Sequence, residues 1–264
     1  MRTALAVTTA ALAALTLAAC GSDSSSSESA ADPVSALQEE GVLRVGTEGT
    51  YSPFTFHDKT TNELTGYDVE VVTAVAEELG VEVEFSETAF DAIFAGLEAE
   101  RYDVVANQVS INDERKAQYD FSTPYTVSTG VVVTRADDSS VTALADVKGK
   151  TSAQSITSNF AETAEAAGAE LEPVEGFTQA VTLLKQGRVD ITINDNLAVL
   201  DYLKTTGDTS VKIAAETEDR TEQALAFRKD SGLAEAASEA LETLRADGTL
   251  TEISEKWFGE DVSR

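Results

Sequence analysis

The chain has 264 residues, enough for one large domain or for two smaller lobes that each hold a hydrophobic core. It carries 47 acidic and 19 basic residues, and this formal net charge of −28 repels nucleic-acid phosphates and anionic lipids. We therefore expect no nucleic-acid partner, and an apolar fraction of 42% spread along the chain predicts a soluble globular body.

Residues 1–19 have the pattern of a secretory signal peptide. Arg2 precedes an apolar run of small residues that is short for a membrane-spanning helix. The run ends in LAACG (17–21), which resembles the lipobox of bacterial lipoproteins. Cys20 is the only cysteine, so no intrachain disulfide can form; besides a passive small residue, it is a candidate for lipidation, as by palmitate.

Acylation of Cys20 would hold the mature protein on the extracytoplasmic face of the cell membrane. The serine-rich stretch that follows has few bulky apolar residues, so we expect residues 20–39 to form a flexible tether.

Strand-like and helix-like segments alternate from residue 42 onward. In the first half, Asp68 can cap a helix whose apolar residues recur at helical spacing up to Gly80. The pattern predicts strands at 42–46, 81–85 and 103–107, and helices at 69–79, near 91–99 and from Asp113.

The second half repeats the alternation. It predicts strands at 151–154, 171–175 and 189–193, and helices at 157–167, 177–186 and 196–204. A strand and a helix that ends near Gly248 follow, and Trp257 and Phe258 are expected to pack a last helix on the core. This order predicts two α/β lobes with mostly parallel sheets.

Two segments of the chain share a pattern. Residues 96–108 and 183–195 both run from a helix end through an aspartate and a strand to polar residues. When Asp103 is aligned with Asp190, Gln108 falls on Asp195. Because ligands of open α/β sheets bind at the carboxyl ends of strands, these polar residues predict a binding site.

Signatures of catalysis and of metal or cofactor binding are missing from the sequence. His57 is the only histidine, in a segment expected to be extended, and HExxH, GxSxG and GxxxxGK[ST] motifs do not occur. We therefore expect no enzyme activity, no catalytic residue, no metal and no cofactor.

Arg115 follows a cluster of small polar side chains and lies about two residues into a helix that Asn112 or Asp113 can cap. A guanidinium beside free backbone amides fits a carboxylate ligand. A surface ion pair with Asp113, Glu114 or Asp120 explains the residue equally well.

Residues 45–80 and 110–125 resemble the extracellular solute-binding proteins, family 3, of amino-acid ABC importers, and the similarity covers about 40–261. Within this group, 151–160 and 176–204 are most similar to receptors for cystine and other polar amino acids.

The resemblance implies a periplasmic-binding-protein-like (type II) clamshell with a two-strand hinge. We place the hinge in the apolar segments 128–138 and 221–229. The predicted lobes are 40–131 with 225–264, and 132–224.

The resemblance also implies ligand-binding residues. Arg115 matches the arginine that holds the ligand α-carboxylate, with Ser110 beside it and with Thr157 and Ser158 closing from the second lobe. The turn before Ser158 departs from the commoner glycine-containing form.

Asp195 matches the carboxylate that binds the α-ammonium, although capping of the helix at 196–204 explains it as well. Gln108 stands where many relatives have glycine, and its long amide can also reach the ligand. Tyr51 and Phe90 match an aromatic pair around the ligand side chain, with core packing as the alternative.

Glu48 and Asn194 are candidates for tuning side-chain preference. A free amino acid is a zwitterion, so its site needs a fixed cation and a fixed anion, here Arg115 and Asp195. We expect a monomeric receptor that delivers a polar amino acid, with cystine favoured, to a membrane permease and its ATPase. The alternatives are a dehydratase-like enzyme on the same fold, with Glu48 as its acid or base, and a sensor acting through a separate membrane partner.

Overall fold

The computed structural model describes residues 32–264, except for the side chains of residues 218 and 219. Residues 32–264 form one compact unit. The predicted signal peptide, the predicted lipidation site Cys20 and residues 20–31 of the predicted tether lie outside the described residues. The tether prediction is wrong for residues 33–39, because Pro33–Glu40 form a helix, α1, that begins with a proline and packs Leu37 into the core. Among residues 32–264, no helix is both long and apolar enough to span a bilayer.

The first sheet has the strand order β5-β1-β6-β13-β7. β1 pairs in parallel with β5 and β6, whereas β13 runs antiparallel to β6 and β7. These strands are β1 (Val42–Thr47), β5 (Glu82–Glu87), β6 (Val104–Val105), β7 (Tyr119–Phe121) and β13 (Ala226–Arg228).

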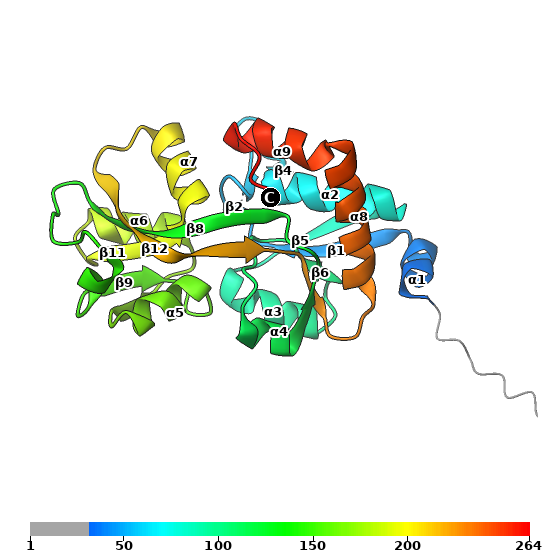
Figure 1. Cartoon of the computed structure of the whole chain (residues 1–264), viewed down its shortest axis with the longest axis horizontal. Helices are drawn as coiled ribbons and strands as arrows, with labels where there is room; N and C mark the ends of the chain where they lie inside the picture. The colour runs from blue at the N-terminus through cyan, green and yellow to red at the C-terminus, as the bar shows by residue number, and fades with distance from the viewer. Residues whose placement is uncertain (1–31) are drawn as a thin grey trace, which may run out of the picture. The chain divides into compact units, whose positions relative to one another are not determined.

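Helices cover both faces of this first sheet (Figure 1). Consecutive residues of a strand point to opposite faces, so Val104 packs in the cluster of α2 and α8 while Val105 packs in that of α3. The helices of this lobe are α1 (Pro33–Glu40), α2 (Tyr67–Leu79), α3 (Phe90–Glu98), α4 (Asp113–Gln118), α8 (Leu233–Asp247) and α9 (Thr249–Phe258). As expected, Trp257 and Phe258 of α9 pack against the core.

The second sheet has the order β10-β9-β11-β8-β12. Its strands are β8 (Thr126–Arg135), β9 (Thr151–Gln154), β10 (Glu170–Pro173), β11 (Ile191–Asp195) and β12 (Val211–Gln223). Val131 and Val133 of β8 pack in the cluster of α6, and Val132 packs in that of α5. The helices here are the 3-10 helix η1 (Leu144–Val147), α5 (Asn159–Ala166), α6 (Phe177–Lys185) and α7 (Asn196–Thr206).

The prediction of mostly parallel sheets holds for three strands of each sheet. β9 is parallel to β10 and β11, but β8 is antiparallel to β11 and β12. The antiparallel strands belong to the segments by which the chain passes between the lobes. Thr126 of β8 pairs with Gln223 of β12 and Arg135 pairs with Val211, with two register shifts between these ends; the two strands run side by side in Figure 1.

The similarity between the two halves has a structural counterpart. The backbone N–H of Asp103 donates to the Arg44 carbonyl (2.8 Å), and the Arg44 N–H donates to the Asp103 carboxylate (3.1 Å). In the other lobe, Asp190 and Thr151 exchange the same two bonds, at 2.9 and 3.0 Å. Each aspartate therefore aligns the strand that leads to Gln108 or ends at Asp195.

The expected cap of α2 is wrong. The helix begins after Gly66, and Asp68 lies inside its first turn, where its buried carboxylate bonds elsewhere. Gly66 has a φ of 134°, and a Cβ there would lie 2.1 Å from the Phe54 carbonyl oxygen, so this entry to the helix requires glycine.

A small antiparallel sheet was not predicted. It consists of β2 (Thr50–Tyr51), β3 (Thr55–His57) and β4 (Leu64–Thr65). His57 ends β3, and its Nε2 lies 3.0 Å from the Glu87 carboxylate. This sheet places Tyr51 at the edge of a cavity between the two lobes.

Candidate functional site

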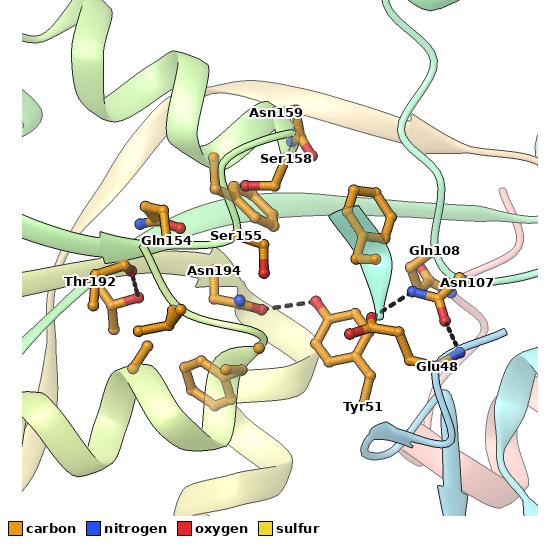
Figure 2. A pocket seen from close by; sticks show the side chains of 17 residues that line it. Glu48, Tyr51, Asn107, Gln108, Gln154, Ser155, Ser158, Asn159, Thr192 and Asn194 are labelled. Carbon is orange, nitrogen blue, oxygen red and sulfur yellow. Dashed lines mark hydrogen bonds between the residues drawn. The ribbon is translucent and has the colours of Figure 1, made fainter. Parts of the chain in front are cut away.

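A cavity of about 50 Å³ lies where the carboxyl ends of strands from both sheets meet (Figure 2). Segments after β1 and β6 line it from the first lobe, and segments after β9 and β10 together with β11 line it from the second. The polar side chains around it are those of Glu48, Tyr51, Asn107, Gln108, Gln154, Ser155, Ser158, Asn159, Thr192 and Asn194.

Glu48 is the only charged side chain among those that line this cavity within residues 32–264. Its Oε2 accepts from the Asn107 amide (2.7 Å), and its backbone N–H donates to Asn107 Oδ1 (2.8 Å), as Figure 2 shows. Burial raises the pKa of Glu48 to about 7, since few groups nearby stabilise its charged form. A positively charged group placed beside Glu48 would lower this pKa and favour the ionised carboxylate.

Tyr51 joins the two lobes across the cavity. Its hydroxyl donates to Asn194 Oδ1 at 2.7 Å (Figure 2), and burial together with nearby carboxylates raises its pKa. Phe90 and Phe177 contribute apolar walls from the first and second lobes.

Arg115 lies beside this cavity and lines an adjoining one that shares Ser158 and Asn159 with it. Its Cζ sits 5.5 Å from the ring centre of Phe90 and 5.4 Å from that of Phe94. Burial lowers its pKa to about 10, so the guanidinium remains charged at neutral pH.

The guanidinium bonds to backbone rather than to acids. Its two terminal nitrogens donate to the Ser110 carbonyl (3.0 Å) and to the Thr157 carbonyl of the second lobe (3.1 Å). Among the described side chains it forms no ion pair. Asp113 and Asp120, which the sequence offered as partners, pair instead with Lys116 and Lys229.

Asp195 lies at the end of β11, buried and away from the cavity lining. Its Oδ1 accepts from the Leu197 N–H (2.8 Å), which caps α7, and its Oδ2 accepts from the Ser128 hydroxyl. Burial raises its pKa to about 6. The helix cap is present, and the structure does not bring Asp195 into one cavity with Arg115.

The turn before α5 is held from the first lobe. Asp91 Oδ1 accepts from the backbone N–H (3.2 Å) and the hydroxyl (2.9 Å) of Thr157, whose carbonyl accepts from Arg115. A further bond runs from the Ser52 hydroxyl to Asp201 of α7 (2.9 Å). The lobes are therefore in direct contact around the cavity.

Six of the predicted ligand residues line the cavity, namely Glu48, Tyr51, Phe90, Gln108, Ser158 and Asn194. Arg115 and Thr157 line the adjoining cavity, and Ser110 contacts Arg115 through its carbonyl. The sequence interpretation missed Asn107, Gln154 and Phe177. Asn107 and Gln154 stand at strand carboxyl ends, and that position was the available signal.

Comparison with known proteins identifies relatives. The family model described as bacterial extracellular solute-binding proteins, family 3, matches residues 43–260. The chain is 54% identical over 256 residues to the L-cystine-binding protein TcyA of Bacillus subtilis (strain 168), covering 96% of this chain and 95% of that protein.

Two solved structures are also similar. The unliganded, open L-cystine solute receptor of Neisseria gonorrhoeae is 49% identical with a TM-score of 0.59, covering 88% of this chain and 98% of that one. An ancestral arginine-binding protein bound to arginine is 39% identical, but its TM-score is 0.77 over 83% of this chain and 99% of that one. The present structure is thus more similar to a ligand-bound protein than to the open receptor.

Proposed function

Because the chain belongs to family 3 of the bacterial extracellular solute-binding proteins, we propose that it captures a free polar amino acid, L-cystine first, for an ABC importer. The observation that carries this proposal is the buried Arg115, which has no acidic partner among the described side chains and stands next to a cavity lined by Glu48. A cation and an anion on neighbouring walls match the two charges of an amino acid.

The carboxylate of the ligand would be held by Arg115. Two of the five N–H donors of the guanidinium are bonded to carbonyls, so others remain for a carboxylate. Ser110, Thr157 and Ser158 surround this end, and Ser158 lies at the N-terminus of α5, where backbone N–H groups favour an anion.

The ammonium end would face Glu48, Gln108 and Asn194, with Asp195 buried behind them. Tyr51 and Phe90 supply the aromatic walls for the rest of the ligand.

Ligand entry requires the lobes to separate. A cavity of about 50 Å³ holds only a few water molecules, and the Tyr51–Asn194 bond crosses it. We propose that β8 and β12 act as the hinge between lobes 40–131 with 225–264 and 132–224, and that closure on the ligand is a rigid-body motion.

We also propose how the protein is held at the membrane and which partner receives its ligand. Cys20 would carry the lipid that keeps the receptor at the extracytoplasmic face, and a permease with its ATPase would receive the ligand from the monomeric, closed receptor. Labelling with a palmitate analogue, compared between the unmodified chain and Cys20→Ser, tests the anchor.

A thermal-shift panel tests the ligand. L-cystine at 100 times its dissociation constant stabilises the folded state by about 2.7 kcal/mol, which raises the melting temperature by several degrees. We expect L-cystine or another polar amino acid to give this shift, and sugars and metal ions to give none. An unchanged melting temperature with every amino acid would contradict the proposal.

The pKa of about 7 at Glu48 is also a property of a general acid or base, so the dehydratase alternative has one observation in its favour. Incubation with cyclic amino-acid relatives separates the two functions. We expect no aromatic product to form.

A further inference from the structure

Gln108 has an unusual backbone. It follows β6 with a φ of 49°, a left-handed conformation that residues with a Cβ seldom adopt. The residue is 7% exposed and lines the cavity, and Figure 2 shows it beside Asn107. Such a conformation persists only when its surroundings hold it in place.

Asp68 holds it. This carboxylate is 0% exposed and accepts two bonds from Gln108, one from the backbone N–H (2.6 Å) and one from the side-chain Nε2 (2.7 Å). The second proton of Nε2 points to the Thr126 hydroxyl (3.1 Å). Since an ionised carboxylate can only accept, the amide nitrogen must face Asp68, and this contact fixes which way the amide points.

The amide oxygen is left without a partner. Gln108 Oε1 is buried, and no donor within the described part of the chain reaches it. Buried acceptors in folded proteins are nearly always satisfied. Among the described residues with a buried, unpartnered polar side-chain atom, Gln108 is the one that lines the cavity, so its free oxygen is a candidate acceptor for a donor that arrives with a ligand.

We propose that Gln108 Oε1 accepts a hydrogen bond from the ammonium group of the bound amino acid, and that Asp68 is the positioning residue that keeps this oxygen facing the ligand. The inference rests on the proposed amino-acid binding and adds a side-chain acceptor to it. The charge of the surroundings supports an ammonium over a carboxylate. Glu48 lines the same cavity, and Asp68 and Asp195 are close enough to raise the pKa of Tyr51.

The test measures L-cystine binding by calorimetry at pH 8 in a cycle of Gln108→Met and Asp68→Asn. Gln108→Met keeps the length of the side chain and removes the acceptor, so we expect affinity to fall roughly 10- to 100-fold. In Asp68→Asn, the new amide nitrogen favours a flipped Gln108, whose N–H groups then oppose the ammonium. We expect a loss at least as large.

The double variant is the decisive comparison. Once Met replaces Gln108 there is no amide to flip, so the double variant is expected to bind within about threefold of Gln108→Met alone. Two independent losses that multiply would overturn the role of Asp68, and an unchanged affinity in Gln108→Met would overturn the whole inference.

Two controls keep the result interpretable. Gln38→Met changes an amide in α1 that donates to the carbonyl of Leu79, the last residue of α2, and this variant is expected to bind L-cystine normally. If the melting curve of Asp68→Asn shows that this variant does not fold, L-cystine binding by Gln108→Met alone tests whether Gln108 Oε1 accepts from the ligand. Absence of L-cystine binding in the unmodified protein would overturn the proposed function, whereas normal binding in Gln108→Met would overturn only this inference.

Discussion

A buried guanidinium without a carboxylate partner destabilises a fold unless other groups offset the lost hydration. At Arg115 the two carbonyl bonds and the faces of Phe90 and Phe94 provide that offset. This environment keeps the charge in place while leaving donors free. The residue is therefore arranged to gain its strongest partner only when an anion binds.

Arg115→Ala is expected to weaken L-cystine binding from about thirtyfold to several thousandfold. The substitution leaves the ligand carboxylate buried without its partner, which costs roughly 2–5 kcal/mol. Calorimetric titration measures the effect. Arg101→Ala, at an exposed arginine, is the matched control and should bind normally, and equal affinities in the two variants would contradict the role of Arg115.

At the scale of elements, the helix α3 reaches across to the turn before α5. Asp91 accepts both bonds from Thr157, and both side chains are exposed. Exposed polar contacts of this kind each contribute about 0.5–1 kcal/mol. The contact joins the lobes outside the cavity that Glu48 lines, and it also holds Thr157, whose carbonyl accepts from Arg115. Asp91 therefore acts mainly on closure.

Asp91→Ala should therefore favour the open form and weaken L-cystine binding by about two- to tenfold, through a free-energy change of roughly 1 kcal/mol. Distances between fluorophores on the two lobes report the closed fraction with and without ligand. Glu77→Ala removes the same charge from the exposed side of α2 and serves as the control. A closed fraction identical to that of the control would show that the contact has no such role.

The elements themselves were largely predictable from the sequence. Periodicity located α2, α6 and α7, and the repeat around Asp103 and Asp190 located two equivalent strands. The small sheet with Tyr51 escaped because its strands have two or three residues each, too few to show an alternation.

Contacts between distant residues were harder to predict than elements. Asp68 looked like a cap because capping is local, whereas its actual partner Gln108 lies 40 positions away. Similarly, a sequence places Asn194 and Asp195 at one strand end but cannot say which side chain faces the ligand. The structure turns Asn194 toward Tyr51 and Asp195 toward Ser128.

At the scale of the whole molecule, the buried Asp68 and Asp195 and the half-buried Glu48 make stability depend on pH. Burial raises the pKa of Glu48 to about 7 and those of Asp68 and Asp195 to about 6. Raised folded-state pKa values mean that the folded protein binds more protons than the unfolded chain between about pH 4 and pH 7. The stability from these groups is present at low pH and is lost as pH rises through 6 to 7.

The ligand-free protein should therefore have a free energy of unfolding larger at pH 5 than at pH 8 by about 2 kcal/mol or more, and should melt at a correspondingly higher temperature at pH 5. His57, whose pKa is raised by its bonds to the Asn62 carbonyl and Glu87, acts in the same direction. Aspartates with lowered pKa values, such as Asp208, stabilise the fold at every pH above about 4, so they do not change the comparison between pH 5 and pH 8. Glu48→Gln should reduce the difference, and a melting temperature that rises with pH over this range would contradict the prediction.

The hydrogen bonds between Tyr51 and Asn194 and between Arg115 and the Thr157 carbonyl join the two lobes through protein groups alone. These bonds stabilise the closed form independently of any ligand. Discrimination between loaded and unloaded receptor by a transport partner would therefore depend on how much stability a bound ligand adds to them.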